Sequence, residues 1–199
     1  MPLSPFPPES DRPIPASAAP AATAVPDGPA LLALERCARR LGSGLTIEQL
    51  QGTWRLEQVW PKGRSEPQRF SGVLLRGLGA QLAIAPAPGA GGEAAPLRIE
   101  NSVRLGALEL RFTGGGRLRG ARPLLEFWFE RLELRLGSAL LLARPLAPMQ
   151  PRRLPFFALI GASRPEASSG LAPDPGADPA WLAARGRGGG LALWRLARP

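Results

Sequence analysis

Short segments in which apolar and polar residues alternate constrain the fold of this chain more than any other feature. A period of two places successive side chains on opposite faces of a strand, so each segment predicts a β-strand with one buried side. Gly and Pro, at 24 residues each, separate the segments. The expected strands are residues 52–60, 80–84, 97–105, 107–112, 124–136, 139–143, 156–160, 181–185 and 191–196. Roughly eight to ten short strands with Gly/Pro turns predict an all-β fold, an antiparallel β-barrel or sandwich.

Glycine clusters predict where the chain reverses. The sequence GRGGG at 186–190 lies between two apolar strands, and Gly tolerates the positive φ angles of tight hairpin loops. This cluster superficially resembles a phosphate-binding loop, but neither a helix nor the characteristic lysine follows it, so a hairpin turn is favoured. The run Gly114–Gly116 is likewise expected to be a loop between two strands.

The chain divides into a tail and one domain. Residues 1–29 form a Pro/Ala/Ser-rich tract that cannot bury enough apolar surface to offset the entropy of ordering, so a disordered tail is expected. Residues 30–199 are expected to form one domain with one core. One or two short helices are predicted to precede the strands. The first carries apolar residues at helical spacing: Leu31, Leu34, Ala38 and Leu41. Glu48 and Gln49 are expected to cap the second.

The residue inventory argues against catalysis. The chain has no His and a single Cys, which excludes a Ser-His-Asp triad, a Cys-His pair, and histidine or multi-thiolate metal sites. No cofactor or metal is therefore expected, and the chain is predicted not to be an enzyme. Cys37 is expected to be a half-buried structural residue, the alternative being a thiol of lowered pKa among the neighbouring arginines.

The charge points to anionic surfaces. The formal net charge is +9, but the arginines are scattered among glutamates and no RNA-recognition motif is present, so nucleic acid is not the expected partner. Anionic lipid headgroups fit the charge better. No run of about 18 apolar residues predicts a membrane span, and no signal peptide is recognised, so a cytoplasmic protein with a peripheral membrane habit is expected.

Several motifs, taken in order, resemble those of the plastid-lipid-associated protein (fibrillin) family of oxygenic phototrophs. After an Leu/Ala-rich helix come LQGTWRL at 50–56, IENSV at 99–103, EFWFE at 126–130 and WLAARGRGGGLALWR at 181–195. These supply the structural motif positions Gly52, Trp54, Asn101, Arg185, Gly186 and Arg195. The resemblance implies a lipocalin-like antiparallel barrel that associates with thylakoid membranes or lipid droplets and binds lipids, carotenoids or quinones.

The expected ligand site is the barrel interior and its open rim. A small barrel can enclose one apolar molecule. The inward residues expected to contact it are Leu56, Leu108, Leu110, Phe112, Phe127 and Phe129. By analogy with lipocalins, Arg195 is expected to cover the Trp54 indole, with Arg195 in solvent as the alternative. Two other functions stay open: a structural or partner-binding barrel filled by its own side chains, and a bilin chromophore lyase.

Overall fold

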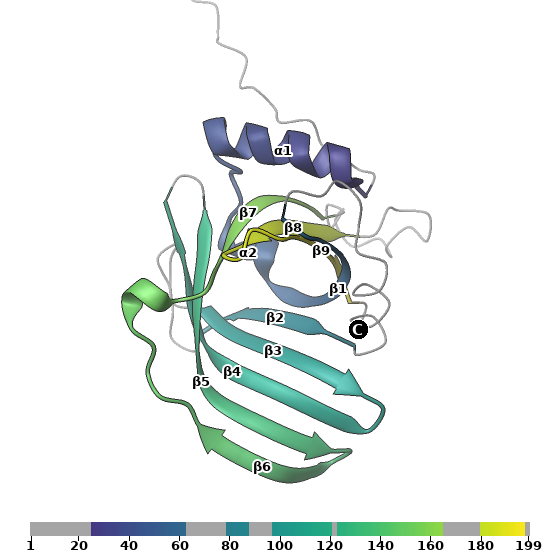
Figure 1. Cartoon of the computed structure of the whole chain (residues 1–199), viewed down its shortest axis with the longest axis vertical. Helices are drawn as coiled ribbons and strands as arrows, with labels where there is room; N and C mark the ends of the chain where they lie inside the picture. The colour runs from purple at the N-terminus through teal and green to yellow at the C-terminus, as the bar shows by residue number, and fades with distance from the viewer. Residues whose placement is uncertain (1–24, 63–78, 88–96, 121–122, 165–179, 198–199) are drawn as a thin grey trace, which may run out of the picture.

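A computed structural model of the chain describes residues 25–62, 79–87, 97–120, 123–164 and 180–197. These residues form two α-helices, one short 3-10 helix and a nine-stranded antiparallel sheet (Figure 1). The elements are α1 (Gly28–Leu41), α2 (Ile47–Leu50), β1 (Gly52–Trp60), β2 (Gln81–Pro86), β3 (Leu97–Leu105), β4 (Leu108–Arg119), β5 (Leu124–Leu136), β6 (Ala139–Pro145), η1 (Pro151–Arg153), β7 (Phe156–Ser163), β8 (Trp181–Gly186) and β9 (Leu191–Leu196).

The sheet closes on itself in a ring. Its strand order is β4-β3-β2-β1-β9-β8-β7-β5-β6, and β4 also pairs with β5. β5 therefore has a divided role, because residues 124–126 pair with β7 and residues 131–136 pair with β6. β6 lies outside the closed ring as an appended edge strand (Figure 1). The expected all-β antiparallel fold with leading helices is confirmed at this level.

The predicted hairpin joins β8 to β9. The Gly186 amide donates to the Gly190 carbonyl at 2.9 Å, and the Gly189 amide donates to the Gly186 carbonyl at 2.8 Å. Gly189 has a φ of 84°, which favours glycine over any residue with a side chain. The hairpin then brings β9 against β1, where Trp54 opposes Leu196 and Trp60 opposes Leu191.

Two apolar clusters form the core, one on each face of the ring wall. The inner cluster gathers side chains from most strands, including Ile99, Leu125 and Leu159, and α2 adds Leu50 to it. Trp54 is fully buried there, and its indole Nε1 donates to the Leu50 carbonyl at 2.7 Å. The outer cluster lies between α1 and the outer face of the wall, and it comprises Leu31, Trp60, Ile160, Trp181, Ala183, Leu191 and Leu193.

The structure corrects the expected loop at Gly114–Gly116, which instead lies inside β4. A Cβ on Gly115 would stand 2.4 Å from Cζ2 of Trp128, and a Cβ on Gly114 would stand 2.1 Å from the Trp128 carbonyl oxygen. These glycines are present because β5 and the Trp128 ring approach the β4 backbone too closely for any side chain.

Helix α1 also differs from expectation. Its buried face runs through Leu31, Glu35 and Ala38, while Leu41 is 78% exposed. Cys37 lies on the far side of the helix and is exposed, so the prediction that it is half-buried was wrong. The helix begins at Gly28, where the Asp27 side chain accepts a hydrogen bond from the Ala30 amide.

Helix α1 begins two residues before residue 30, where the expected domain starts. Residues 1–24 of the expected tail lie outside the described part of the chain. The second helix is capped as expected, because the Gln49 side chain accepts a hydrogen bond from the Thr46 amide at 3.0 Å. No helix in the described ranges is long and apolar enough to cross a membrane.

Candidate functional site: an open apolar sheet face

The inner face of the ring wall continues onto β6 as a surface of apolar side chains. Residues directly opposite each other in neighbouring strands share a face of the sheet. Three cross-strand rows result: Asn101-Phe112-Leu132-Arg144, Val103-Leu110-Leu134-Leu142, and Leu105-Leu108-Leu136-Ala139. We call the apolar members of these rows the open apolar face. They are Val103, Leu105, Leu108, Leu110, Phe112, Leu132, Leu134, Leu136, Ala139 and Leu142.

The side chains of this face that lie farthest from the inner cluster are exposed to solvent. The exposed fractions are 61% for Leu105, 39% for Leu108, 50% for Leu136 and 49% for Leu142. Every residue of β6 is exposed; Leu142 belongs to this face, whereas Leu140 is opposite Arg135 on the other face of the sheet. Contiguous exposed apolar side chains of this kind mark surfaces that contact ligands, membranes or other proteins.

The opposite face of the same strands is polar and held by ion pairs. Glu109 accepts from Arg111 at 2.9 Å and from Arg104 at 3.2 Å, and Glu133 accepts from Arg131 at 2.8 Å. Burial alone raises the pKa of Glu109, but the hydrogen bonds from the two arginines outweigh it and leave that pKa below its usual value. This outer face therefore carries charged side chains held in ion pairs, whereas the inner face presents exposed apolar side chains.

A run of aromatic rings joins the open apolar face to the inner cluster. Ring centroids are 5.3 Å apart for Phe112 and Phe129, 5.6 Å for Phe129 and Phe127, 5.1 Å for Phe127 and Phe157, and 5.3 Å for Phe157 and Trp194. Such tilted and edge contacts are favourable aromatic geometries. The open face is thus continuous with the buried interior of the ring.

The structure separates the predicted site residues into two groups. It brings Leu108, Leu110, Phe112 and Phe129 together on or beside the open apolar face. Phe127 instead belongs to the inner cluster, and Leu56, like Phe129, packs against that cluster. The open apolar face also contains five residues that were not among the predicted site residues: Val103, Leu105, Leu134, Leu136 and Leu142. The alternation in 132–136 was the signal that could have identified part of this set.

The expected pairing of Arg195 with Trp54 was wrong. Arg195 opposes Arg55 in the β1–β9 register, on the outer face, and its guanidinium bonds to the Glu57 carboxylate. Arg164, just after β7, places its guanidinium carbon 5.9 Å from the centroid of the Trp54 ring. The Arg164 side chain also donates to the carbonyls of Glu48 and Gln51. It therefore ties α2 to the end of the ring.

The remaining motif residues serve the fold. Gly52 has a φ of 128°, and a Cβ there would stand 2.7 Å from Cδ1 of Leu196, so only glycine fits. Asn101 is half-buried in the row that contains Phe112. Gly186 begins the hairpin turn.

Arg185 forms an ion pair with Glu35 beneath α1. Its Nε donates to a Glu35 carboxylate oxygen at 2.6 Å, and Arg39 donates to the same carboxylate at 2.7 Å. The side chain of Glu35 is only 4% exposed, yet these bonds, chiefly the one from Arg185, lower its pKa to about 2. Beside the pair is a shallow pocket of about 530 Å³ lined by Pro29, Leu32, Glu35, Arg36, Arg39 and Arg185. The position of Arg185 and its full set of bonds indicate a structural role.

Comparisons with protein families, curated proteins and solved structures found no match to this chain.

Proposed function

We propose that this chain is a non-catalytic binding protein for long apolar molecules, and that the open apolar face is its binding surface. The ligand class is a lipid, a carotenoid or a prenylquinone. The observation that carries the proposal is the set of half-exposed leucines at the outer end of this face, next to the aromatic run that leads into the ring. Covering about half of each exposed leucine by a ligand gains roughly 1 kcal/mol per side chain.

The proposal includes a lipocalin-like barrel that acts at a membrane surface, as expected of a distant member of the fibrillin family. Arg144 lies in one row of the open apolar face, and Arg152 and Arg153 lie exposed on η1. Among the described residues, none of these three arginines forms an ion pair. Their charge favours anionic headgroups beside the apolar surface, which supports a peripheral thylakoid location.

The test replaces leucines that the fold does not need. In the double variant Leu136→Asn/Leu142→Asn, both changed side chains are about half exposed, so the ring should remain intact. Leu41→Asn on α1 is the matched control, because that leucine is exposed on another element. We expect the double variant to sediment with anionic vesicles about tenfold less efficiently than the control. Equal sedimentation of the two variants would overturn the proposed surface.

Two further measurements separate this function from its alternatives. An apolar extract of the purified protein should show carotenoid or quinone absorption bands or contain acyl lipid. Transfer of a bilin to a phycobiliprotein would favour the lyase, and neither result would favour a partner-binding barrel. Vesicle binding should also weaken between about 0.1 M and about 1 M salt, where the screening length falls from about 10 to about 3 Å.

A further inference from the structure

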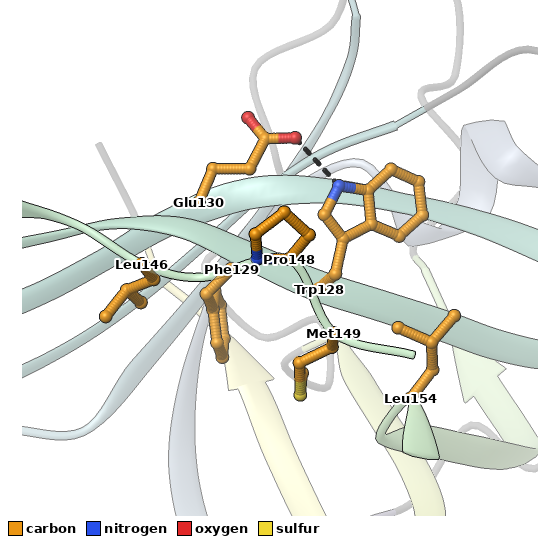
Figure 2. Close-up of a pocket in the computed structure, with 7 residues that line it drawn as sticks. All are labelled: Trp128, Phe129, Glu130, Leu146, Pro148, Met149 and Leu154. Atoms are coloured by element: carbon orange, nitrogen blue, oxygen red, sulfur yellow. Dashed lines mark hydrogen bonds between the residues drawn. The ribbon is translucent and has the colours of Figure 1, made fainter. Parts of the chain in front are cut away.

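A pocket lies beside β5 at the point where this strand changes partners. β5 pairs with β7 up to Glu126 and with β6 from Arg131 onward. The segment that links β6 to β7 runs along the intervening residues. Its Leu146 amide donates to the Glu130 carbonyl at 2.7 Å, and its Pro155 carbonyl accepts from the Phe127 amide at 3.1 Å. Between these two bonds the segment and the strand enclose a half-open pocket of about 290 Å³ (Figure 2).

The pocket is apolar with one carboxylate. Its apolar lining comprises Phe129, Leu146, Pro148, Met149 and Leu154. Trp128 and Glu130 complete it, and the Trp128 indole Nε1 donates to a Glu130 carboxylate oxygen at 2.8 Å (Figure 2). This bond fixes both side chains relative to each other.

Glu130 differs from the neighbouring glutamates of β5. Glu126 pairs with Arg117 and Arg119, and Glu133 pairs with Arg131 and Arg135. Glu130 forms no ion pair within the described residues, and Trp128 is its side-chain donor there. A carboxylate has about four acceptor positions, so Glu130 can accept further hydrogen bonds.

Hydrogen bonds from the β8–β9 hairpin hold the linking segment that lines the pocket, and the pocket leads to the open apolar face. Arg187, in the β8–β9 hairpin, donates to the carbonyls of Leu154 at 3.0 Å and Arg152 at 3.2 Å, which holds the linking segment in place. Phe129 lines the pocket and also contacts Phe112 of the aromatic run. A chain that leaves the pocket over Phe129 therefore reaches the open apolar face.

We propose that this pocket binds the head of an amphiphile whose apolar chain ends in a hydrogen-bond donor, a hydroxyl or an amine. The chain lies over Phe129 onto the open apolar face, so the inference rests on the proposed function and adds the chemistry of the ligand head. A donor head satisfies the open acceptor positions of Glu130. A carboxylate or phosphate head faces the Glu130 charge and is rejected.

The test compares three ligands with the same twelve-carbon chain, dodecanol, dodecylamine and dodecanoate, by calorimetry at neutral pH with the full chain. We expect a donor-headed ligand, one or both of the first two, to bind about tenfold more tightly than dodecanoate. If dodecylamine alone binds more tightly than dodecanoate, the natural head is cationic. If dodecanol binds as tightly as dodecylamine, the natural head is a hydroxyl.

Variants assign the selectivity to Glu130. Glu130→Gln should reduce the preference for dodecylamine over dodecanoate by about tenfold. Trp128→Phe keeps an aromatic ring but removes the indole donor, so it should reduce the preference less. Glu133→Gln is the matched control on the same strand, and it should leave the preference unchanged. A preference unchanged in Glu130→Gln would overturn the assignment.

The two proposals fail in different ways. Equal binding of all three ligands, lost in Leu136→Asn/Leu142→Asn, would overturn the head pocket and leave the open apolar face standing. Binding of none of them would overturn both.

Discussion

The two sides of the ring differ in what covers an apolar strand surface. On the side of β7, β8 and β9, the inner face packs into the inner cluster and the outer face packs under α1. On the side of β3 to β6, the outer face carries ion pairs and the inner face ends in exposed leucines. Strand periodicity is the same on both sides. Alternation therefore determines which side chains share a face, whereas burial requires a second layer.

The ion pairs show the same contrast. The Glu35–Arg185 pair is enclosed by α1 and the hairpin, with side chains 4% and 19% exposed. On the outer face of β5, Arg131 is half exposed where it meets Glu133. Exposed pairs contribute little to stability, whereas removal of one partner from a buried pair leaves an uncompensated charge. The covered side should therefore be sensitive to changes that the uncovered side tolerates.

The largest difference is expected for two Glu→Gln variants. Glu35→Gln leaves the Arg185 guanidinium buried without its carboxylate, which should lower the free energy of unfolding by about 3–5 kcal/mol. Glu133→Gln, on the uncovered side, should lower it by less than about 1 kcal/mol. Chemical denaturation measures both. Equal losses would show that α1 does not enclose its ion pair.

Leucine truncation tests the packing on the two sides. Leu159→Ala removes a side chain that is 1% exposed in the inner cluster, and it should cost about 3 kcal/mol of unfolding free energy. Leu136→Ala removes one that is 50% exposed on the open apolar face, and about 1 kcal/mol is expected. A cost for Leu136→Ala as large as that for Leu159→Ala would mean that the open face is packed in solution.

Acid should remove the contribution of Glu35. Its pKa is about 2 in the folded chain against an ordinary value of 4.5, so the folded state binds the proton less tightly than the unfolded state. The contribution is complete above pH 4.5 and disappears as the pH falls toward 2, a change of about 2–3 kcal/mol. The gap in stability between the natural chain and Glu35→Gln should therefore narrow from pH 6 to pH 2.5. A constant gap would contradict the assignment.

The smallest effect concerns the glycines of β4. Gly115→Ala places a Cβ 2.4 Å from the Trp128 ring, so the ring must shift and weaken its bond to Glu130. We expect a loss of about 1–2 kcal/mol in thermal or chemical unfolding. Gly188→Ala is the control, because no atom lies within 4 Å of the added methyl group. If the two variants unfold alike, the close approach of β4 and β5 does not restrict which residue can occupy position 115.

Alternation of apolar and polar residues made several strands predictable, although its phase shifts at the bulges in β1 and β5. The bounds of β1, β3, β5 and β9 agree with the sequence analysis, because no residue within them conflicts with a strand. β4 was cut short because three glycines favour a turn locally, while the contact with Trp128 that requires them comes from another strand. The glycines locally favour a turn, but their contact with Trp128 keeps them in a strand.

The site was only partly predictable for a related reason. Alternation identifies Leu108, Leu110 and Phe112 as one face, but it does not indicate that the face stays uncovered. The Arg195 prediction failed because its face depends on the β1–β9 register, which follows from pairing rather than from composition. The pocket beside β5 depends on a linking segment with no periodic signal.

The bond between Glu35 and Arg185 spans 150 positions of the sequence, and this separation determines how early in synthesis the bond can form. A ribosome adding about 5–20 residues per second needs roughly 10–30 s between the two residues. Throughout that interval the Glu35 carboxylate lacks its bond from Arg185, and β1 lacks β9, its neighbour in the closed ring. Such non-local contacts form slowly. The nascent chain therefore passes through a period with its apolar segments uncovered, and the protein assembles late, when the C-terminal hairpin emerges.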